Sequence, residues 1–451
     1  MKIDISNSRV GGFNFEFLRA VSYGATEGSE LGEAIAAIQS VDEGNFESWI
    51  RAFSLLADRT SAGAEEFLHG NQNVSARSAF LRASNYYRAA EFYANSSDPR
   101  QYDAWKKSRD CFRKAAQLMS PPVEVLEIPF ESSRLPAYFV SGGDDRRPTL
   151  IAMSGFDGSG EELYHMIGRA SAERGWHCLI FEGPGQRGAL HLNPGLRFRP
   201  DYEVPVRSVV DYAISRPDVD PDRLALIGYS FGGCLAPRAA AFDNRIRACI
   251  ADSLVVDVGE AWRAAWPKPL RDAPDRVFDT IFSTIAHSNP DARWGLDHAK
   301  WAMGIQHPHE MFRAFEPYTL RGLEGQIACP LLSLFGEDEI AQTSKNLIAS
   351  TVKFLGALKC SNELRLFTRE EGAAAHCQFG ALGQAQAVIF EWLEKVLGPG
   401  SREIKLGTAG FSIPTNFKIL VEKYHGKEFA QQLTEMKLAD SKGLENEVLH
   451  A

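Results

Sequence analysis

The sequence predicts an α/β fold with a mostly parallel sheet flanked by helices, preceded by a helical domain and interrupted by a helical cap. From residue 149 onward, short apolar runs alternate with helical stretches, which is typical of a parallel sheet covered on both faces. One run, Leu224 to Ile227, leads directly into Gly228-Tyr229-Ser230-Phe231-Gly232, a glycine-flanked serine where a strand turns into a helix. A chain of 451 residues is long enough for two or three domains.

The N-terminal part, residues 1–120, is expected to form a helical lid domain. Between Gly44 and Leu118, apolar and aromatic residues recur at three- and four-residue steps, the period of a helix with one buried face. Pro121 and Pro122 end this pattern, because proline disfavours helical backbone in the residue before it. The next domain therefore begins near residue 121.

The core domain is expected over residues 121–254 and 324–398. A helix is expected after the serine motif, from Cys234 to Ala241, and another from Gln384 to Val396. The segments with strand-like patterns are 123–128, 135–140, 149–153, 178–181, 224–227, 246–251, 330–335 and 363–367.

Residues 255–323 break the strand rhythm and are interpreted as a helical cap inserted into the core. After the core, residues 399–451 form a C-terminal extension with an amphipathic helix expected from Asn416 to Lys437. This helix and the N-terminal domain are candidate surfaces for a homodimer. The cap contains four tryptophans in helical context: Trp262, Trp266, Trp294 and Trp301.

Composition argues for a soluble globular protein that does not bind nucleic acid. Hydrophobic residues make up 44% of the chain and charged residues 24%, which are ordinary values. The formal net charge is -9 and there is no long basic stripe, whereas a nucleic-acid surface needs clustered lysine and arginine.

The seven cysteines and the chain start indicate a cytoplasmic location. The cysteines are odd in number, scattered and without a C-x-x-C pair, which argues against a disulfide framework and a zinc ribbon. Residues Met1 to Arg9 lack the apolar stretch of a secretory signal, and no window is apolar enough to span a membrane.

The serine motif predicts a catalytic triad in the order serine, acid, histidine. Ser230 is the expected nucleophile, since a hydroxyl needs a base and the base needs an acid behind it. Asp338 directly follows the strand-like run ending at Phe335 and is the expected acid, with Glu337 and Glu339 as rivals. His376 follows the last predicted strand and is the expected base.

An oxyanion hole is expected at two backbone N–H groups, those of Phe231 after the nucleophile and Phe156 in the loop after an early strand. Asp157 in the same loop has two open interpretations. In the first, Asp157 donates a proton to the substrate or anchors it. In the second, the loop caps a helix that starts at Asp157 or Ser159, with a capping box over Ser159 to Glu162.

Cofactor and metal sites are not expected. Gly183-Pro184-Gly185-Gln186-Arg187-Gly188 matches a dinucleotide-binding pattern, but that pattern requires a helix to open there, and Pro194 precludes a long one. His307 and His309 lack a third ligand at a suitable spacing.

Together these motifs resemble one branch of the α/β-hydrolases, that of 2,6-dihydroxypseudooxynicotine hydrolase and the fungal polyketide-shortening hydrolases of naphthopyrone and melanin pathways. The resemblance spans Phe46 to Leu397. It rests on the serine motif, Asp338, His376, the Ser154 to Glu162 loop, the Phe181 to Gln186 turn and the helical Arg82 to Glu91 segment.

The resemblance implies an enzyme that cleaves a carbon–carbon bond next to a ketone, with Ser230, Asp338 and His376 as its triad and a helical N-terminal domain closing the active site. It also places Asp157 where a catalytic glutamate is expected, so the shorter carboxylate is a departure. Glu182 is a second departure, because the turn more often begins with aspartate.

Four functions follow for this triad and its aromatic or polyketide-like substrate. The first is retro-Claisen hydrolysis, in which Ser230 attacks a ketone and a stabilised carbanion leaves. The second is ester or lactone hydrolysis, for which His376 alone protonates the leaving alcohol. The third is acyl transfer or cyclisation, favoured if the cap excludes water. The fourth, a non-catalytic binding protein, is disfavoured by the complete triad.

Overall fold

The computed structural model describes residues 11–398 and 411–436, which divide into two compact units. Unit 1 comprises residues 1–147, 156–199 and 268–314, and unit 2 comprises the remaining residues. The expectations for Met1 to Arg9, and for the parts of the C-terminal extension at 399–410 and 437–451, lie outside the described residues. The expected alternation of strands and helices is confirmed, and the described residues contain eight strands.

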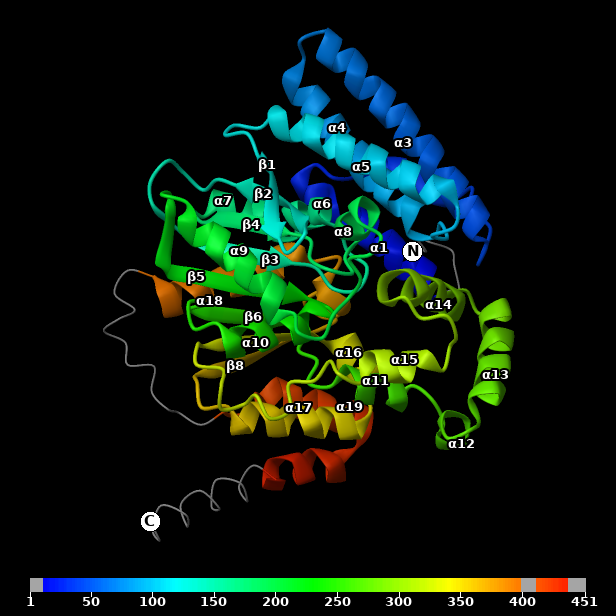
Figure 1. The fold of residues 1–451 in the computed structure, drawn as a ribbon, viewed down its shortest axis with the longest axis vertical. Coiled ribbons are helices and arrows are strands. Elements are labelled where there is room, and N and C mark those ends of the chain that lie inside the picture. Colours follow the sequence, from blue (N-terminus) through cyan, green and yellow to red (C-terminus); the bar gives the residue numbers. More distant parts are fainter. Residues whose placement is uncertain (1–10, 399–410, 437–451) are drawn as a thin grey trace. The chain divides into compact units, whose positions relative to one another are not determined.

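Unit 1 is mainly helical, as the three- and four-residue steps predict. Its longest helices, α3, α4 and α5, lie side by side, with α4 between the other two (Figure 1). Helix α4 is consequently buried along almost its whole length. The helices of unit 1 are α1 Gly11–Ser22, α2 Leu31–Ile38, α3 Phe46–His69, α4 Asn73–Phe92, α5 Pro99–Gln117, α6 Gly160–Leu163, α7 Arg169–Glu173, α8 Arg187–Leu192, α12 Lys268–Arg271, α13 Asp275–Ser288 and α14 Pro290–Met303.

Local sequence explains where the N-terminal helices begin. The side chain of Asn45 accepts hydrogen bonds from the backbone N–H groups of Glu47 and Ser48, which caps α3. Asp98 caps α5 in the same way, and Pro99 occupies the first turn, where a missing N–H costs nothing. These caps satisfy backbone donors that the helix itself leaves unpaired.

Three strands belong to unit 1: β1 (Glu124–Phe130), β2 (Ser133–Val140) and β4 (His177–Phe181). Strands β1 and β2 form an antiparallel hairpin, and β2 pairs with β4, also antiparallel. The interior of β4 is buried at all five positions. Between the strands and the helices the core of the unit is rich in aromatic rings, and Phe13 packs on Trp49 with 4.8 Å between ring centroids.

Unit 2 contains five strands in the order β3-β5-β6-β7-β8. The pairs from β5 to β8 are parallel. The second half of β5 and all of β6 and β7 are buried on both faces, as expected from continuous apolar runs. The strands are β3 Arg147–Met153, β5 Val219–Tyr229, β6 Ala248–Asp252, β7 Leu331–Gly336 and β8 Asn362–Phe367.

Helices connect the parallel strands of unit 2 (Figure 1). Helix α10 packs on β5 and β6, and α18 packs on β6. The helices are α9 Glu203–Ser215, α10 Gly232–Phe242, α11 Val258–Ala264, α16 Glu337–Gln342, α17 Lys345–Ala357, α18 Leu382–Leu397 and α19 Thr415–His425, while α15 Glu310–Phe315 spans the point where the chain passes between the units.

The register brings the carboxyl ends of β5 to β8 to one edge of the sheet. Tyr229 is opposite Asp252, Asp252 is opposite Leu334, and Gly336 is opposite Phe367. Loops that follow these ends share that edge, which is where ligands bind in open α/β sheets. The candidate site lies there.

The C-terminal amphipathic helix differs from its expected form. The sequence predicts one helix from Asn416 to Lys437, but α19 ends at His425 and the described chain becomes helical again only at 427. Gly426 separates the two parts with a φ of 93°, a left-handed conformation that glycine adopts without steric cost and that a continuous helix does not contain.

Candidate active site

Ser230 occupies the sharp turn between β5 and α10. Its φ is 58°, in the left-handed region that non-glycine residues rarely adopt, so the turn holds local strain of the kind found at nucleophile elbows. A Cβ on Gly228 would lie 2.1 Å from the carbonyl oxygen of Gly232. Only glycine at that position lets the strand and the helix approach this closely.

His376 lies in the short helical segment His376–Gln378 after β8, with its ring directed at the nucleophile. Its Nε2 is 2.8 Å from Oγ of Ser230. This separation suits a hydrogen bond from the serine hydroxyl to the neutral imidazole, which is the geometry needed for proton abstraction.

The acid that contacts His376 is Glu339, whereas the sequence analysis expected Asp338. Oε1 of Glu339 is 2.6 Å from Nδ1 of His376. Oε2 of Glu339 accepts a hydrogen bond of 2.7 Å from the backbone N–H of Gly336, and Ser253 donates its hydroxyl to Oε1.

Asp338 points elsewhere and accepts hydrogen bonds from Nε and Nη2 of Arg369 at 2.9 and 2.5 Å. Successive residues of a helix differ in direction by about 100°, so neighbouring carboxylates in the first turn of α16 face different partners. A local signal was present in the sequence: Glu339 is the third residue of a helix, where glutamate characteristically reaches back to the N-cap.

Burial and two neighbouring groups, Cys377 and Glu339, shift the pKa of His376. Burial favours the neutral ring, but the neighbouring Cys377 sulfur and the Glu339 carboxylate outweigh it, and the pKa of His376 is raised well above its ordinary value. Burial raises the pKa of Cys377 to about 11, so that thiol is neutral at pH 7. Since that thiol is uncharged, the carboxylate of Glu339 is the neighbouring group placed to stabilise a positive charge on the His376 ring.

Asp252 and Ser253, at the carboxyl end of β6, support the site, and the sequence analysis did not single them out. The carbonyl oxygen of Asp252 accepts a 2.5 Å hydrogen bond from the N–H of Ser230, which anchors the turn. Its Oδ1 accepts from Nε2 of Gln378 at 3.2 Å. Burial, followed by the negative charge of Glu339, raises the pKa of Asp252 to about 7.

The loop after β3 lies against the nucleophile. A Cβ on Gly155 would be 2.7 Å from Cβ of Ser230 and 2.8 Å from the backbone nitrogen of Phe231. The two backbone N–H groups expected to form an oxyanion hole belong to Phe231, next to this contact, and Phe156, the residue that follows Gly155.

Further along this loop, within unit 1, two backbone carbonyls are held by buried side chains. Nε2 of His298 is 2.8 Å from the carbonyl oxygen of Phe156, and Nε of Arg187 donates to that of Asp157 at 2.6 Å. Burial, followed by the positive charge of Arg187, lowers the pKa of His298 to about 3. The ring is therefore neutral, and its Nε2 carries the proton that the carbonyl accepts.

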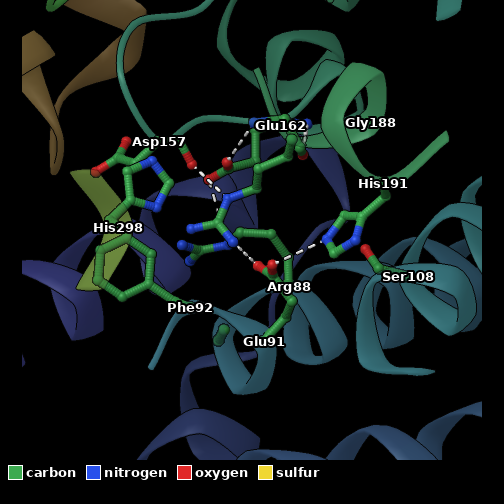
Figure 2. Close-up of polar contacts among 12 residues, drawn as sticks. Arg88, Glu91, Phe92, Ser108, Asp157, Glu162, Gly188, His191 and His298 are labelled. Atoms are coloured by element: carbon green, nitrogen blue, oxygen red, sulfur yellow. Dashed lines mark hydrogen bonds and ion pairs between the residues drawn. The ribbon is translucent and has the colours of Figure 1, made fainter. Parts of the chain in front are cut away.

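Asp157 belongs to a network of buried charges in unit 1, shown in Figure 2. Its Oδ1 accepts from Nη1 of Arg19 at 3.3 Å. As the partner of an arginine, this carboxylate is a hydrogen-bond acceptor. The expected capping box is present, because Ser159 is the N-cap of α6 and its side chain and that of Glu162 make the two reciprocal hydrogen bonds.

Glu162 is the centre of this network. It accepts from Nε and Nη2 of Arg19 at 2.7 and 2.8 Å, and it lies 3.3 Å from Nε of Arg88. Burial opposes its charge, but Arg19 and Arg88 more than compensate and lower its pKa to about 2. Arg187 pairs with Glu91, and the guanidinium groups of all three arginines lie 5.4 to 5.9 Å from the ring of Phe92.

A pocket in unit 1 lies beside His298. The N-terminal helices and α14 of the expected cap both contribute to it, and aromatic rings form much of its wall. These rings belong to Phe46, Phe92, Tyr93, Trp294, His298 and Trp301.

The Gly183 to Gly188 segment leads into α8, which ends at Leu192, two residues before Pro194. The side chain of Gln186 accepts a 2.7 Å hydrogen bond from the N–H of Gly183, so the turn is closed by its own residues. Within residues 11–398 and 411–436, no group of three or more histidine, cysteine or acidic side chains is placed to hold a metal ion. No helix in this part of the chain has the length and apolar character to cross a membrane.

Comparison with known proteins gives close relatives among fungal hydrolases. The hydrolase acrC of Aspergillus aculeatus is 32% identical over 88% of this chain and 98% of its own length. The 20-hydroxy-prefusarin hydrolase FUS2 of Gibberella moniliformis is 32% identical over 85% of this chain and 96% of its own.

A solved structure shares the fold. The crystal structure of 2,6-dihydroxy-pseudo-oxynicotine hydrolase matches with a TM-score of 0.65 and 21% identity, covering 83% of this chain and 95% of that one. The profile of the alpha/beta hydrolase family matches residues 150–379, the segment that contains Ser230, Glu339 and His376. The chain therefore belongs to the alpha/beta hydrolase family and is a hydrolase.

Proposed function

We propose that the protein is a serine hydrolase in which Ser230 attacks a ketone carbonyl, His376 is the general base and Glu339 orients and stabilises the imidazolium. The observation that carries this proposal is the continuous chain of contacts from Oγ of Ser230 to His376 at 2.8 Å and from His376 to Glu339 at 2.6 Å. This is the arrangement by which a serine hydroxyl becomes a nucleophile.

The reaction proceeds through an acyl-enzyme. Oγ of Ser230 bonds to the carbonyl carbon as its proton passes to His376, giving a tetrahedral oxyanion. The bond from that carbon to its neighbour then breaks, and the electron pair leaves as an enolate, which takes up a proton from the imidazolium. Water, activated by His376, adds to the ester and releases the acid, so a diketone and water give a carboxylic acid and a ketone.

The oxyanion is proposed to bind the N–H groups of Phe231 and Phe156. The close contact of Gly155 with Ser230 supports this assignment, because Gly155 directly precedes Phe156 and so brings the chain close to the serine at that point. The hydrogen bonds from His298 and Arg187 also fix the two peptide groups that follow. Preorganised donors of this kind contribute about 100- to 1000-fold each to the rate.

The proposed substrate is an aromatic or polyketide-like molecule with a ketone beside the scissile carbon–carbon bond. The resemblance of the Ser154 to Glu162 loop and the Phe181 to Gln186 turn supports this class. A relative is named for hydrolysis of 20-hydroxy-prefusarin. Asp157, held by Arg19, is suited to accept a hydrogen bond from a substrate hydroxyl.

Ester or lactone hydrolysis is the second candidate, because the same contacts between Ser230, His376 and Glu339 suffice for it. In both reactions His376 is the proton donor for the leaving group. An alcohol leaving group needs no further acid.

Paired substrates separate the two candidates. Aryl esters and aryl 1,3-diketones would be incubated in ¹⁸O-water with the wild type and with Ser230→Ala, and products followed by mass spectrometry. We expect the wild type to cleave the diketone, with one ¹⁸O in the acid product, and the variant to be inactive. Turnover of esters alone would establish a carboxylesterase, and diketone cleavage by Ser230→Ala would refute the serine mechanism.

We further propose that the enzyme acts in the cytoplasm as a homodimer. All seven cysteines are free thiols, which suits a reducing compartment. Helix α19 supplies a candidate dimer surface, since Ile419 on it is 60% exposed. Light scattering tests the second point, and a monomer would refute it.

A further inference from the structure

Helix α16 begins with three consecutive carboxylates that point to three different partners. Glu339 meets His376, Asp338 meets Arg369, and Glu337 turns to the C-terminal helix α19. The side chain of Glu337 is only 4% exposed, although it carries a charge. A buried carboxylate needs compensating partners, so its surroundings are informative.

The partners of Glu337 come largely from α19. Its Oε1 accepts from the hydroxyl of Tyr424 at 2.6 Å and from Nζ of Lys423 at 2.9 Å, and its Oε2 accepts from the backbone N–H of Arg369 at 2.9 Å. Burial opposes the charge, but Tyr424, Arg369 and Lys423 together lower the pKa of Glu337 to about 2. The carboxylate is therefore ionised at any pH at which the enzyme would act.

Two other contacts tie α19 to the same region. Nε2 of His425 is 2.8 Å from the carbonyl oxygen of Ile340, the fourth residue of α16. Nη1 of Arg369 donates to the hydroxyl of Tyr424 at 2.5 Å, and its guanidinium lies 5.6 Å from the Tyr424 ring. Helix α19 lies beside α16 in unit 2 (Figure 1).

Helix α16 depends on such contacts for its position. It has only six residues, and so short a helix is not stable by itself, because the cost of helix nucleation is recovered over few hydrogen bonds. The carboxylate of Glu339 is held by His376, by the N–H of Gly336 and by the hydroxyl of Ser253. The backbone that carries it is held at Asp338, whose N–H donates to the carbonyl of Ala374, and through the side chain of Glu337. Packing by α19 thus acts on the element that supplies the proposed triad acid.

We propose that α19 positions the acid of the active site without touching the reacting atoms. Tyr424 and Lys423 are positioning residues that hold Glu337, and through α16 they place Glu339 against His376. This inference rests on the proposed function only in naming Glu339 as the triad acid. It assigns a role to the C-terminal extension, which lies beyond the segment matched by the family profile. The role is mechanical, since neither side chain reaches the reacting atoms in this arrangement.

The test uses the full-length chain with the double substitution Tyr424→Phe and Lys423→Met. The tyrosine change removes one hydroxyl and the lysine change removes one charge, which leaves Glu337 with the backbone N–H of Arg369 and with the Arg369 guanidinium at 3.6 Å. Lys427→Met is the matched control, because Lys427 is exposed and lies just beyond α19. Thermal unfolding of each variant establishes the temperature below which it is folded.

The primary readout is the titration of His376 by NMR with ¹³C-labelled histidine, assigned through the signal lost in His376→Gln. We expect the midpoint for His376 to fall towards about 6.5, the value of an unperturbed histidine, in the double variant and to stay in place in Lys427→Met. Labelling of Ser230 by a fluorophosphonate should slow by about tenfold or more, as misplacement of catalytic groups predicts.

An unchanged His376 midpoint in the folded double variant would overturn the proposal, even if its melting temperature fell, because α19 would then contribute only stability. The proposed function fails separately. If the wild type is not labelled at Ser230, the serine mechanism is refuted, while the NMR titration still decides whether α19 controls the contact between Glu339 and His376.

Discussion

Replacing Glu339 by glutamine should abolish most of the activity, whereas replacing Asp338 by asparagine should not. Oε1 of Glu339 faces Nδ1 of His376 and Oε2 faces the N–H of Gly336, so both oxygens accept hydrogen bonds. A glutamine has one acceptor oxygen, and its amide NH₂ would face one of these donors. The substitution therefore removes the negative charge and also places donor against donor.

The magnitude follows from the charge. Two unit charges about 4 Å apart interact by about 4 kcal/mol at an effective dielectric of about 20. This interaction exists only when His376 is protonated, so it lowers the barrier to proton abstraction, and its loss corresponds to about a 1000-fold fall in kcat. Asp338 instead pairs with Arg369, whose side chain is 54% exposed, and such surface pairs contribute about 0 to 1 kcal/mol.

The assay is steady-state hydrolysis of an activated aryl ester by the wild type, Glu339→Gln and Asp338→Asn, each shown to be folded by thermal unfolding. We expect kcat to fall by about 1000-fold or more in Glu339→Gln and to change by less than about fivefold in Asp338→Asn. The reverse ranking would refute the assignment of Glu339 and return the acid to Asp338.

Three further predictions concern titration, the loop and stability. The pKa of His376 is raised, and the neutral ring is the proposed base. A profile of kcat/KM against pH should therefore fall as the pH is lowered, with a midpoint above about 6.5. A midpoint below that value would contradict this prediction. His298→Ala should lower kcat about tenfold with little change in KM, because the carbonyl of Phe156 loses its donor. His298→Gln should retain more activity, because glutamine keeps a donor. The control is His165→Gln, which replaces a buried histidine elsewhere in unit 1 and should leave kcat unchanged in the same assay. Glu162→Ala should cost about 3 kcal/mol in urea unfolding, because it removes a carboxylate that two buried arginines share and leaves Glu16 as their common partner. A loss under about 1 kcal/mol would show that Glu162 contributes little.

Much of the fold could be predicted because its signals are local. Parallel strands buried on both faces appear as continuous apolar runs, and the glycines around Ser230 mark a turn that a side chain would obstruct. His376 could be located because it follows the last strand. The C-terminal helix was predicted as continuous because hydrophobic periodicity carries across Gly426, although its backbone conformation ends the helix there.

The acid and the charge network could not be predicted by the same means. To choose among Glu337, Asp338 and Glu339, one must know how the short helix is rotated about its axis. Each successive residue of a helix points in a direction that differs by about 100° from the one before. The side chain of Asp157 pairs with Arg19, which lies 138 residues away in the chain. No local pattern encodes a contact of that kind.

The most direct test of the account is covalent labelling of the nucleophile. The wild type, Ser230→Ala and His376→Ala would be treated with a fluorophosphonate, digested and mapped by mass spectrometry. We expect one modified peptide, containing Ser230, in the wild type. That peptide should be unmodified in Ser230→Ala, and labelling should be strongly slowed in His376→Ala. An enzyme that hydrolyses its substrate without labelling at Ser230, or that labels equally fast without His376, would contradict it.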